Sequence, residues 1–192
     1  RNDHRRLWSF RIWRAILLGV LLAIIARLFI VGAYSVSSAS MSPTLKTGQH
    51  VLVWKWSKLT GVHRGDVIVF DGTDSFVAAD ASNESFIQEI LGIKQLDNHL
   101  FVKRVIGIGG DSVKCCDAEG FLLLNGERLV ENYLIQGMHP SDVAFDVKVP
   151  QGTVWVMGDN RSLSQDSRSL LGRPGGGMIN EAKIVGRVAY II

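Results

Sequence analysis

The chain opens with one long apolar run and continues with short apolar segments separated by turn residues. Residues 15–33 (AILLGVLLAIIARLFIVGA) hold a single charged side chain, and a helix of this length spans about 30 Å, the thickness of a hydrocarbon core. Trp8 and Trp13 flank one end and Tyr34 the other, as aromatic rings do at membrane interfaces. The pattern predicts a transmembrane helix over 15–34. A cleavable secretory signal and a buried core helix are the alternatives, but the run exceeds the length of a signal's apolar region.

Beyond Tyr34, β-branched and aromatic residues recur in short runs bounded by turn residues, which is the pattern of strands. These runs are 51–56, 66–70, 101–106, 112–114, 121–124, 152–157 and 184–191. Asn125-Gly126 predicts a two-residue hairpin because both positions tolerate positive φ. Residues 72–98 read as an insertion with a short helix over 86–91, and 163–180 read largely as a loop. The predicted fold class is mainly β: one N-terminal transmembrane helix followed by an antiparallel β-rich catalytic domain.

Charge is distributed unevenly along the chain, whose formal net charge is +3. Residues 1–14 carry five arginines against one aspartate, whereas the chain beyond Tyr34 is slightly acidic. The positive-inside rule therefore predicts a cytoplasmic basic segment over 1–14 and an extracytoplasmic domain over 35–192, with a small inserted β subdomain at about 112–149. No basic groove remains outside the N-terminal end, so we expect no nucleic-acid partner.

The sequence contains no spacing typical of a metal site or of a nucleotide-binding loop. Cys115 and Cys116 are adjacent, which leaves either two free thiols or a vicinal disulfide, and no His/Cys spacing typical of a metal site accompanies them. The five histidines are scattered. The glycines of 107–110 lack the spacing of a phosphate-binding loop and no helix follows them. We therefore expect neither a metal nor a cofactor.

Three stretches carry candidate chemistry. Residues 38–45 place small side chains around Ser40, although serine-rich linkers next to membrane segments are common. Lys103 lies inside an apolar strand, where loss of water would lower its pKa and make it a candidate general base. The alternative is an edge-strand lysine with its ammonium group in water. Residues 158–168 combine acids, arginines and serines, either as a surface loop or as a hydrogen-bonded wall that orients another group.

Four ordered motifs strongly resemble those of type I signal peptidases, which are membrane-bound serine proteases. The motifs are Ser-Met-Ser-Pro-Thr-Leu (40–45), Arg-Gly-Asp-Val-Ile-Val-Phe (64–70), Lys-Arg-Val-Ile-Gly-Ile-Gly-Gly-Asp (103–111) and Gly-Asp-Asn-Arg through Asp-Ser-Arg (158–168). The resemblance extends over residues 15 to about 190, and the cysteine pair resembles actinobacterial members. Ala39 and Ser37 depart from the glycine and proline common in relatives, but neither change removes a reacting group.

The resemblance implies a role for each matching residue. Ser40 corresponds to the nucleophile and Lys103 to its general base. Ser164 corresponds to the serine that orients the lysine, and the oxyanion-hole donors are the Ser38 hydroxyl and the Ser40 N–H. The remaining charged residues of the motifs are expected to form ion pairs around the site; they are Arg104, Asp159, Arg161, Asp166 and Arg168.

The resemblance also implies a substrate and a location. The expected function is removal of signal peptides from exported preproteins by cleavage after small residues of Ala-X-Ala type, in a single-pass protein of the plasma membrane. The expected partners are preproteins, the lipid bilayer and the protein export machinery. A related Ser/Lys protease dedicated to one substrate is the alternative, and a non-catalytic membrane-anchored β module is a third hypothesis. Trp54 and Trp56 share one face of a predicted strand. They either form an apolar patch that dips into the bilayer or belong to the hydrophobic core.

Overall fold

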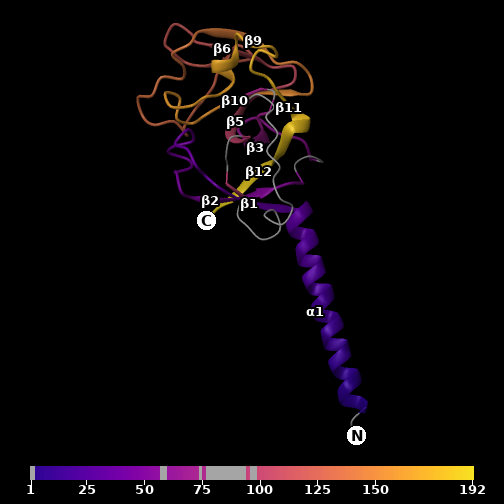
Figure 1. The fold of residues 1–192 in the computed structure, drawn as a ribbon. Coiled ribbons are helices and arrows are strands. Elements are labelled where there is room, and N and C mark those ends of the chain that lie inside the picture. Colours follow the sequence, from indigo (N-terminus) through magenta and orange to yellow (C-terminus); the bar gives the residue numbers. More distant parts are fainter. Residues whose placement is uncertain (1–2, 57–59, 74, 77–93, 96–98) are drawn as a thin grey trace.

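A computed structural model describes residues 3–56, 60–73, 75–76, 94–95 and 99–192, with side chains described from residue 11 onward except at 25–29 and 94–95. One helix, α1, projects away from two β-sheets, and the smaller sheet lies at the end remote from α1 (Figure 1). The predicted helix over 86–91 and most of the insertion over 72–98 lie outside the described residues.

The larger sheet has eight strands in the order β11-β10-β5-β3-β12-β2-β1-β4. Their bounds are β1 Val31–Ser35, β2 His50–Trp54, β3 Val67–Asp71, β4 Lys94–Gln95, β5 Leu100–Ile108, β10 Thr153–Met157, β11 Ile179–Asn180 and β12 Ile184–Ile191. Neighbours pair antiparallel, except that β1 and β4 are parallel. The predicted mainly antiparallel β fold is confirmed.

The smaller sheet has four strands in the order β8-β7-β6-β9. Their bounds are β6 Ser112–Cys115, β7 Leu123–Leu124, β8 Glu127–Arg128 and β9 Phe145–Lys148. Asn125 and Gly126 join β7 to β8 with φ of 55° and 84°, so the predicted hairpin is confirmed. The described part of the chain also holds two short 3-10 helices, η1 Ser167–Leu170 and η2 Glu181–Lys183. η1 and β11 fall within the stretch 163–180 that was predicted to be largely loop.

β5 is the longest strand and lies between β3 and β10 in the larger sheet. Its side chains enter three separate clusters of the hydrophobic core, because Val102 packs in one, Val105 in the second and Ile106 in the third. Packing on all sides restricts the movement of the backbone that carries Lys103. Lys103 thus lies on a strand whose neighbouring residues are packed into the core.

The N-terminal helix differs from the prediction in its bounds. α1 runs from Asp3 to Phe29, so it begins before residue 15 and ends before residue 34. Residues 31–34 belong instead to β1, whose pairing with β2 satisfies their backbone groups. Val31 and Gly32 are weak helix formers, so the sheet determines their conformation.

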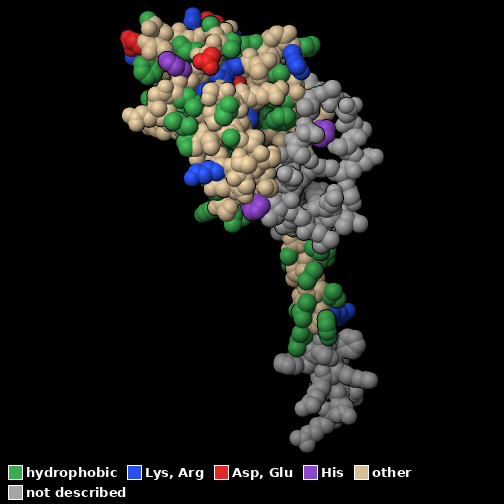
Figure 2. All heavy atoms as spheres, turned by 60° about the vertical axis from the view of Figure 1, so that its left-hand side comes forward, with side chains coloured by type: hydrophobic (Ala, Val, Ile, Leu, Met, Phe, Trp, Pro, Cys, Tyr) green, Lys and Arg blue, Asp and Glu red, His purple; other side chains and the backbone are tan. Residues whose placement is uncertain are grey.

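The predicted membrane span over 15–34 is not supported by this helix. Within the described residues, no helix combines the length and the hydropathy that a membrane crossing requires. The large apolar side chains that the structure describes between residues 12 and 24 of α1 are nevertheless exposed, with Leu17 at 65% and Leu22 at 56% (Figure 2). Trp54 and Trp56 are also exposed, at 41% and 47%, so their interpretation as core residues is wrong.

Candidate active site

Ser40 and Lys103 meet although 63 residues separate them in the sequence. Ser40 lies in a series of turns that follows β1, and Lys103 is in the middle of β5. The Lys103 Nζ donates to Ser40 Oγ at 2.8 Å and to the carbonyl of Val102 at 3.0 Å. Both side chains are buried, with Ser40 5% and Lys103 3% exposed. An amine and a hydroxyl held at this distance have the geometry for proton transfer.

Burial changes the acid–base properties of Lys103. Desolvation lowers the pKa of Lys103 from 10.5 to about 8, although the negative charges of Asp166 and Asp159 oppose the change. At pH 7 about a tenth of the side chain is then neutral, against about one part in three thousand at the unperturbed pKa. The edge-strand alternative, with the ammonium group in water, is therefore wrong. Lys103 has the pKa of a usable general base.

Residues 158–160 hold the backbone around Ser40 in place. The Asn160 N–H donates to the carbonyl of Ser40 at 2.9 Å, and its side-chain amide donates to the carbonyl of Ala39 at 3.2 Å. The Ser38 hydroxyl lies 3.2 Å from that of Ser40, and Ser38 is an exposed residue. These contacts hold Ser40 from the side of the loop while Lys103 holds its hydroxyl.

Ser164 is near the site, but its hydroxyl is not hydrogen-bonded to Lys103. Its Oγ is buried and has no hydrogen-bond partner in the part of the chain that the structure describes. It packs against Gly158, where an added Cβ would lie 2.2 Å from Ser164 Oγ and 2.5 Å from the carbonyl oxygen of Ser40. Only glycine at 158 allows these two groups to approach together.

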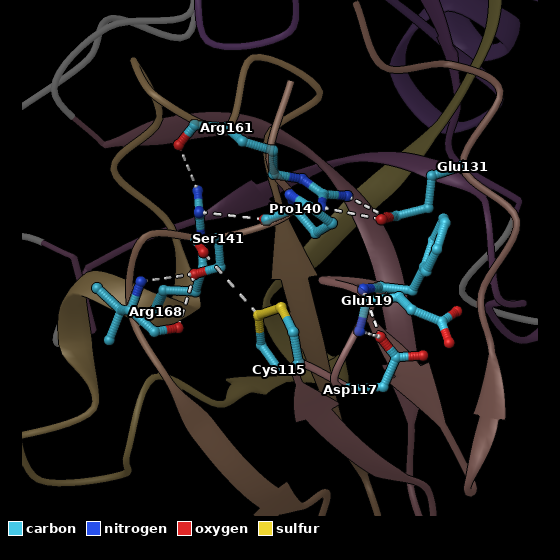
Figure 3. The surroundings of a disulfide bond; sticks show 11 residues. Cys115, Asp117, Glu119, Glu131, Pro140, Ser141, Arg161 and Arg168 are labelled. Carbon is cyan, nitrogen blue, oxygen red and sulfur yellow. Dashed lines mark hydrogen bonds and ion pairs between the residues drawn. A yellow bond between two sulfur atoms is a disulfide. The ribbon is translucent and has the colours of Figure 1, made fainter. Parts of the chain in front are cut away.

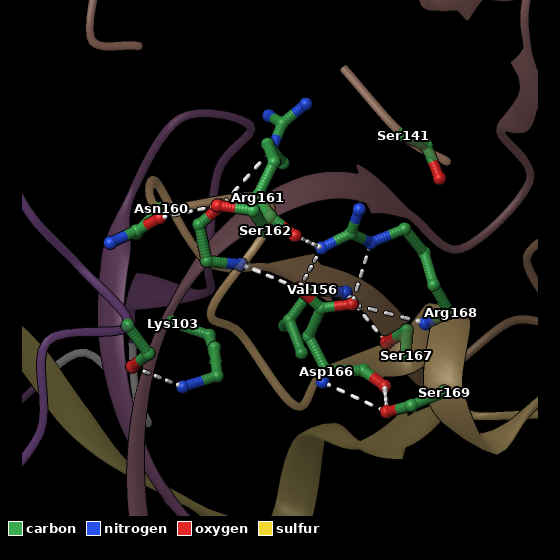
Figure 4. Close-up of polar contacts among 12 residues, drawn as sticks. Lys103, Ser141, Val156, Asn160, Arg161, Ser162, Asp166, Ser167, Arg168 and Ser169 are labelled. Carbon is green, nitrogen blue, oxygen red and sulfur yellow. Dashed lines mark hydrogen bonds and ion pairs between the residues drawn. The ribbon is translucent and has the colours of Figure 1, made fainter. Parts of the chain in front are cut away.

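Two buried carboxylates beside the site are paired with arginines. Asp159 accepts from Arg104 Nε at 2.8 Å and Nη2 at 2.6 Å. Asp166 accepts from Arg168 Nε at 2.9 Å and Nη2 at 2.8 Å, and also from the N–H of Gly158 at 2.9 Å (Figure 4). Such bidentate pairs compensate charges that would otherwise be costly to bury.

The two cysteines form a vicinal disulfide rather than free thiols. The disulfide lies beside Ser141, whose carbonyl is 4.0 Å from the Cys115 Sγ (Figure 3). Among the described residues, no group of three or more His, Cys, Asp or Glu side chains is arranged to hold a metal ion.

Known proteins with similar sequences identify the family. The family model described as signal peptidase, peptidase S26, matches residues 9–192. The chain belongs to the signal peptidase family. Signal peptidase I of Bacillus licheniformis is 31% identical over 187 residues, which cover 93% of this chain and 85% of that relative. The probable signal peptidase I of Mycobacterium leprae (strain TN) is 31% identical, with 97% of this chain and 76% of the relative covered.

A solved structure is similar as well. The crystal structure of a signal peptidase I from Enterococcus faecalis V583 matches with a TM-score of 0.44 and 23% identity, covering 67% of this chain and 97% of that one. Membership of the family confirms the predicted enzyme class, a peptidase that removes signal peptides.

Three residues that contact this signal peptidase site had no role assigned from the sequence. Gly158 and Asn160 fall inside the last motif, so the motif itself is a signal for them. Glu131 is different, because it lies between β8 and β9, outside all four motifs. Its carboxylate pairs with Arg161, and both side chains are almost fully buried. A lone glutamate outside every motif gives no sequence signal for such a contact.

Proposed function

We propose that Ser40 is the nucleophile of this signal peptidase and that neutral Lys103 is its general base. The observation that supports the proposal is the 2.8 Å contact between Lys103 Nζ and Ser40 Oγ, made by a lysine whose pKa is lowered to about 8. As the hydroxyl attacks the scissile carbonyl, Nζ takes its proton and later gives it to the leaving amine. Nζ then activates the water that hydrolyses the acyl-enzyme.

The developing oxyanion is stabilised by the Ser40 N–H and the Ser38 hydroxyl. The proximity of the Ser38 and Ser40 hydroxyls, 3.2 Å apart, supports this assignment. Loss of one such donor typically lowers the rate by about 10²–10³. Ser164, whose buried Oγ has no partner among the described residues, orients Lys103 once substrate is bound.

The substrates are preproteins cut after small residues, of Ala-X-Ala type. Relatives that are named signal peptidase I support this class of substrate. A protease dedicated to one preprotein is the alternative. Cleavage of a panel of unrelated signal peptides discriminates the two, because a dedicated enzyme would leave most of them intact.

We further propose that α1 anchors the chain in the plasma membrane with residues 1–14 in the cytoplasm, and that residues 35–192, including the insert at about 112–149, lie outside. The exposed apolar side chains of α1 and the five arginines before residue 15 support this topology (Figure 2). The bilayer and the export machinery are the proposed partners. Alkaline extraction of cell membranes tests the anchor: release of the full chain into the supernatant would contradict it.

The proposed dyad is tested by cleavage of a signal-peptide substrate by the full chain in detergent. Ser40→Ala and Lys103→Ala are each expected to lower kcat by at least about 10³-fold, because each removes a reacting group. Lys114→Ala is the matched control, since Lys114 is a half-exposed lysine on β6. Turnover near that of the wild type in either dyad variant would refute the mechanism, and loss in all three would point to unfolding.

A further inference from the structure

The segment between β8 and β9 contacts the catalytic region through Glu131 and Tyr133. The Glu131 carboxylate accepts from both terminal nitrogens of Arg161, and the two side chains are 6% and 2% exposed. The Tyr133 hydroxyl donates to Glu131 at 2.8 Å, and the Tyr133 ring lies 4.0 Å from the guanidinium carbon of Arg104. Burial raises the pKa of Tyr133, so its hydroxyl remains a donor. Two residues of the insert thus touch two arginines of the catalytic motifs.

From Arg161 a short path leads to the nucleophile. Arg161 Nε donates to the carbonyl of Gly158 at 3.0 Å, and Nη1 donates to the carbonyl of Pro140 at 2.9 Å. The turn that begins at Gly158 contains Asn160, whose N–H holds the carbonyl of Ser40 at 2.9 Å. Figure 3 shows the Arg161 side chain between Pro140 and Glu131. The Arg161 guanidinium therefore joins the insert to the turn that holds Ser40.

A second path leads to the base. Arg104 follows Lys103 on β5 and is paired with the buried Asp159, while Tyr133 covers its guanidinium. Glu131 and Tyr133 are joined by their own hydrogen bond, so the position of one depends on the other. The same pair of insert residues therefore contacts the strand of the base and the turn that holds the nucleophile.

We propose that Glu131 is a positioning residue for the proteolytic reaction, which holds Arg161 and, with Tyr133, keeps Ser40 aligned with Lys103. The proposal rests on the proposed dyad function. Without the Glu131 carboxylate, the buried charge of Arg161 has no ion-pair partner among the described residues, which favours movement of its side chain toward water. The Gly158 carbonyl then loses its donor and the 158–160 turn relaxes. A displacement of about 1 Å at a nucleophile can lower the rate by about 10²-fold.

The test is steady-state cleavage of a signal-peptide substrate by the full chain carrying Glu131→Gln. We expect kcat to fall by about 10- to 100-fold with KM within about twofold, because the substrate surface is unchanged. Glu131→Asp should restore most of the loss, since it keeps the charge. Asp146→Asn is the matched control: it removes a carboxylate from the same insert, at the exposed ion pair with Lys114, and should leave kcat unchanged.

A double variant tests the path through Arg161. If Glu131 acts through this arginine, Glu131→Gln combined with Arg161→Gln should lower kcat no further than Arg161→Gln alone. If the losses in kcat of the two single variants multiplied in the double variant, Glu131 would not act through Arg161. A folded Glu131→Gln variant with the kcat of the wild type would overturn the proposal, as would a loss that vanishes after normalisation to the folded fraction.

Tyr133→Phe provides an independent test should Glu131→Gln fold poorly. It removes only the hydroxyl bonded to Glu131 and keeps the ring over Arg104, so we expect kcat to fall by about 3- to 10-fold. An unchanged kcat in this variant would also overturn the proposal. Ser40→Ala, assayed in parallel, distinguishes failure of the dyad from failure of the positioning role. If Ser40→Ala still cleaves the substrate, the proposed dyad is wrong. If Ser40→Ala is inactive while Glu131→Gln is as active as the wild type, the dyad stands and only the positioning role of Glu131 is rejected.

Discussion

Replacing Lys103 with methionine should inactivate the enzyme and alter how its stability depends on pH. The Lys103 side chain is 3% exposed, and desolvation lowers its pKa from 10.5 to about 8. The unfolded chain therefore binds this proton more tightly than the folded one does. The difference corresponds to a loss of about 3 kcal/mol of folding free energy at pH values below 8. As the pH rises from 8 to 10.5, the unfolded chain loses its advantage and the penalty disappears.

The assay is denaturant unfolding of the full chain in detergent between pH 7 and pH 10.5, for the wild type and Lys103→Met. The hydrogen bonds lost with the amine change the free energy of unfolding of the methionine variant by an amount that does not depend on pH. The contributions of other titrating groups are the same in both proteins and cancel when the two free energies are subtracted. The stability of the variant relative to the wild type should therefore fall by about 2–3 kcal/mol as the pH rises through this range. The half-exposed Lys114→Met should show no such trend. A difference that does not vary with pH for Lys103→Met would refute a lowered pKa.

Other substitutions test the surroundings of the dyad. Gly158→Ala should lower both activity and stability, the latter by about 1–3 kcal/mol, because its Cβ would overlap Ser164 Oγ; Gly172→Ala, with open space around it, is the control in the same melting and turnover assays. Asp159→Asn should lower the free energy of unfolding by about 3–5 kcal/mol, since it leaves Arg104 without its partner; denaturant titration that shows a change below about 1 kcal/mol would contradict this. Ser164→Ala should reduce kcat but keep the unfolding free energy within about 1 kcal/mol, because the hydroxyl has no partner among the described residues. A loss of stability large enough to account for the fall in kcat would instead show that the Ser164 side chain acts through packing.

Features encoded by local patterns were predictable from the sequence. Five strands of the larger sheet, β2, β3, β5, β10 and β12, alternate or run apolar over several residues and were predicted, whereas β1, β4 and β11 were not. Asn125-Gly126 has the turn chemistry of its hairpin, which was predicted as well. Lys103 was a candidate because a lysine inside an apolar strand conflicts with its surroundings, and the resemblance of residues 103–111 to a signal peptidase motif selected it. Such a conflict between local pattern and residue type is typical of functional positions.

Features that depend on contacts distant in sequence were not predictable. The end of α1 at Phe29 is set by pairing between β1 and β2, which overrides an apolar pattern that continues unchanged through residue 33. Glu131 meets Arg161 only because the segment between β8 and β9 lies against Arg161 in the folded chain, and no spacing along the chain signals this contact. The absence of a Ser164–Lys103 hydrogen bond is a matter of side-chain geometry, which a motif does not specify.

The pH dependence of kcat/KM for the wild-type enzyme tests the central claim, that neutral Lys103 is the base for Ser40, most directly. Because the pKa of Lys103 is about 8, the account predicts that kcat/KM rises about tenfold per unit below pH 8 and levels off above it. A profile that is flat between pH 6 and pH 8, or whose acid limb has its midpoint near 6.5 as for a histidine, would contradict the account.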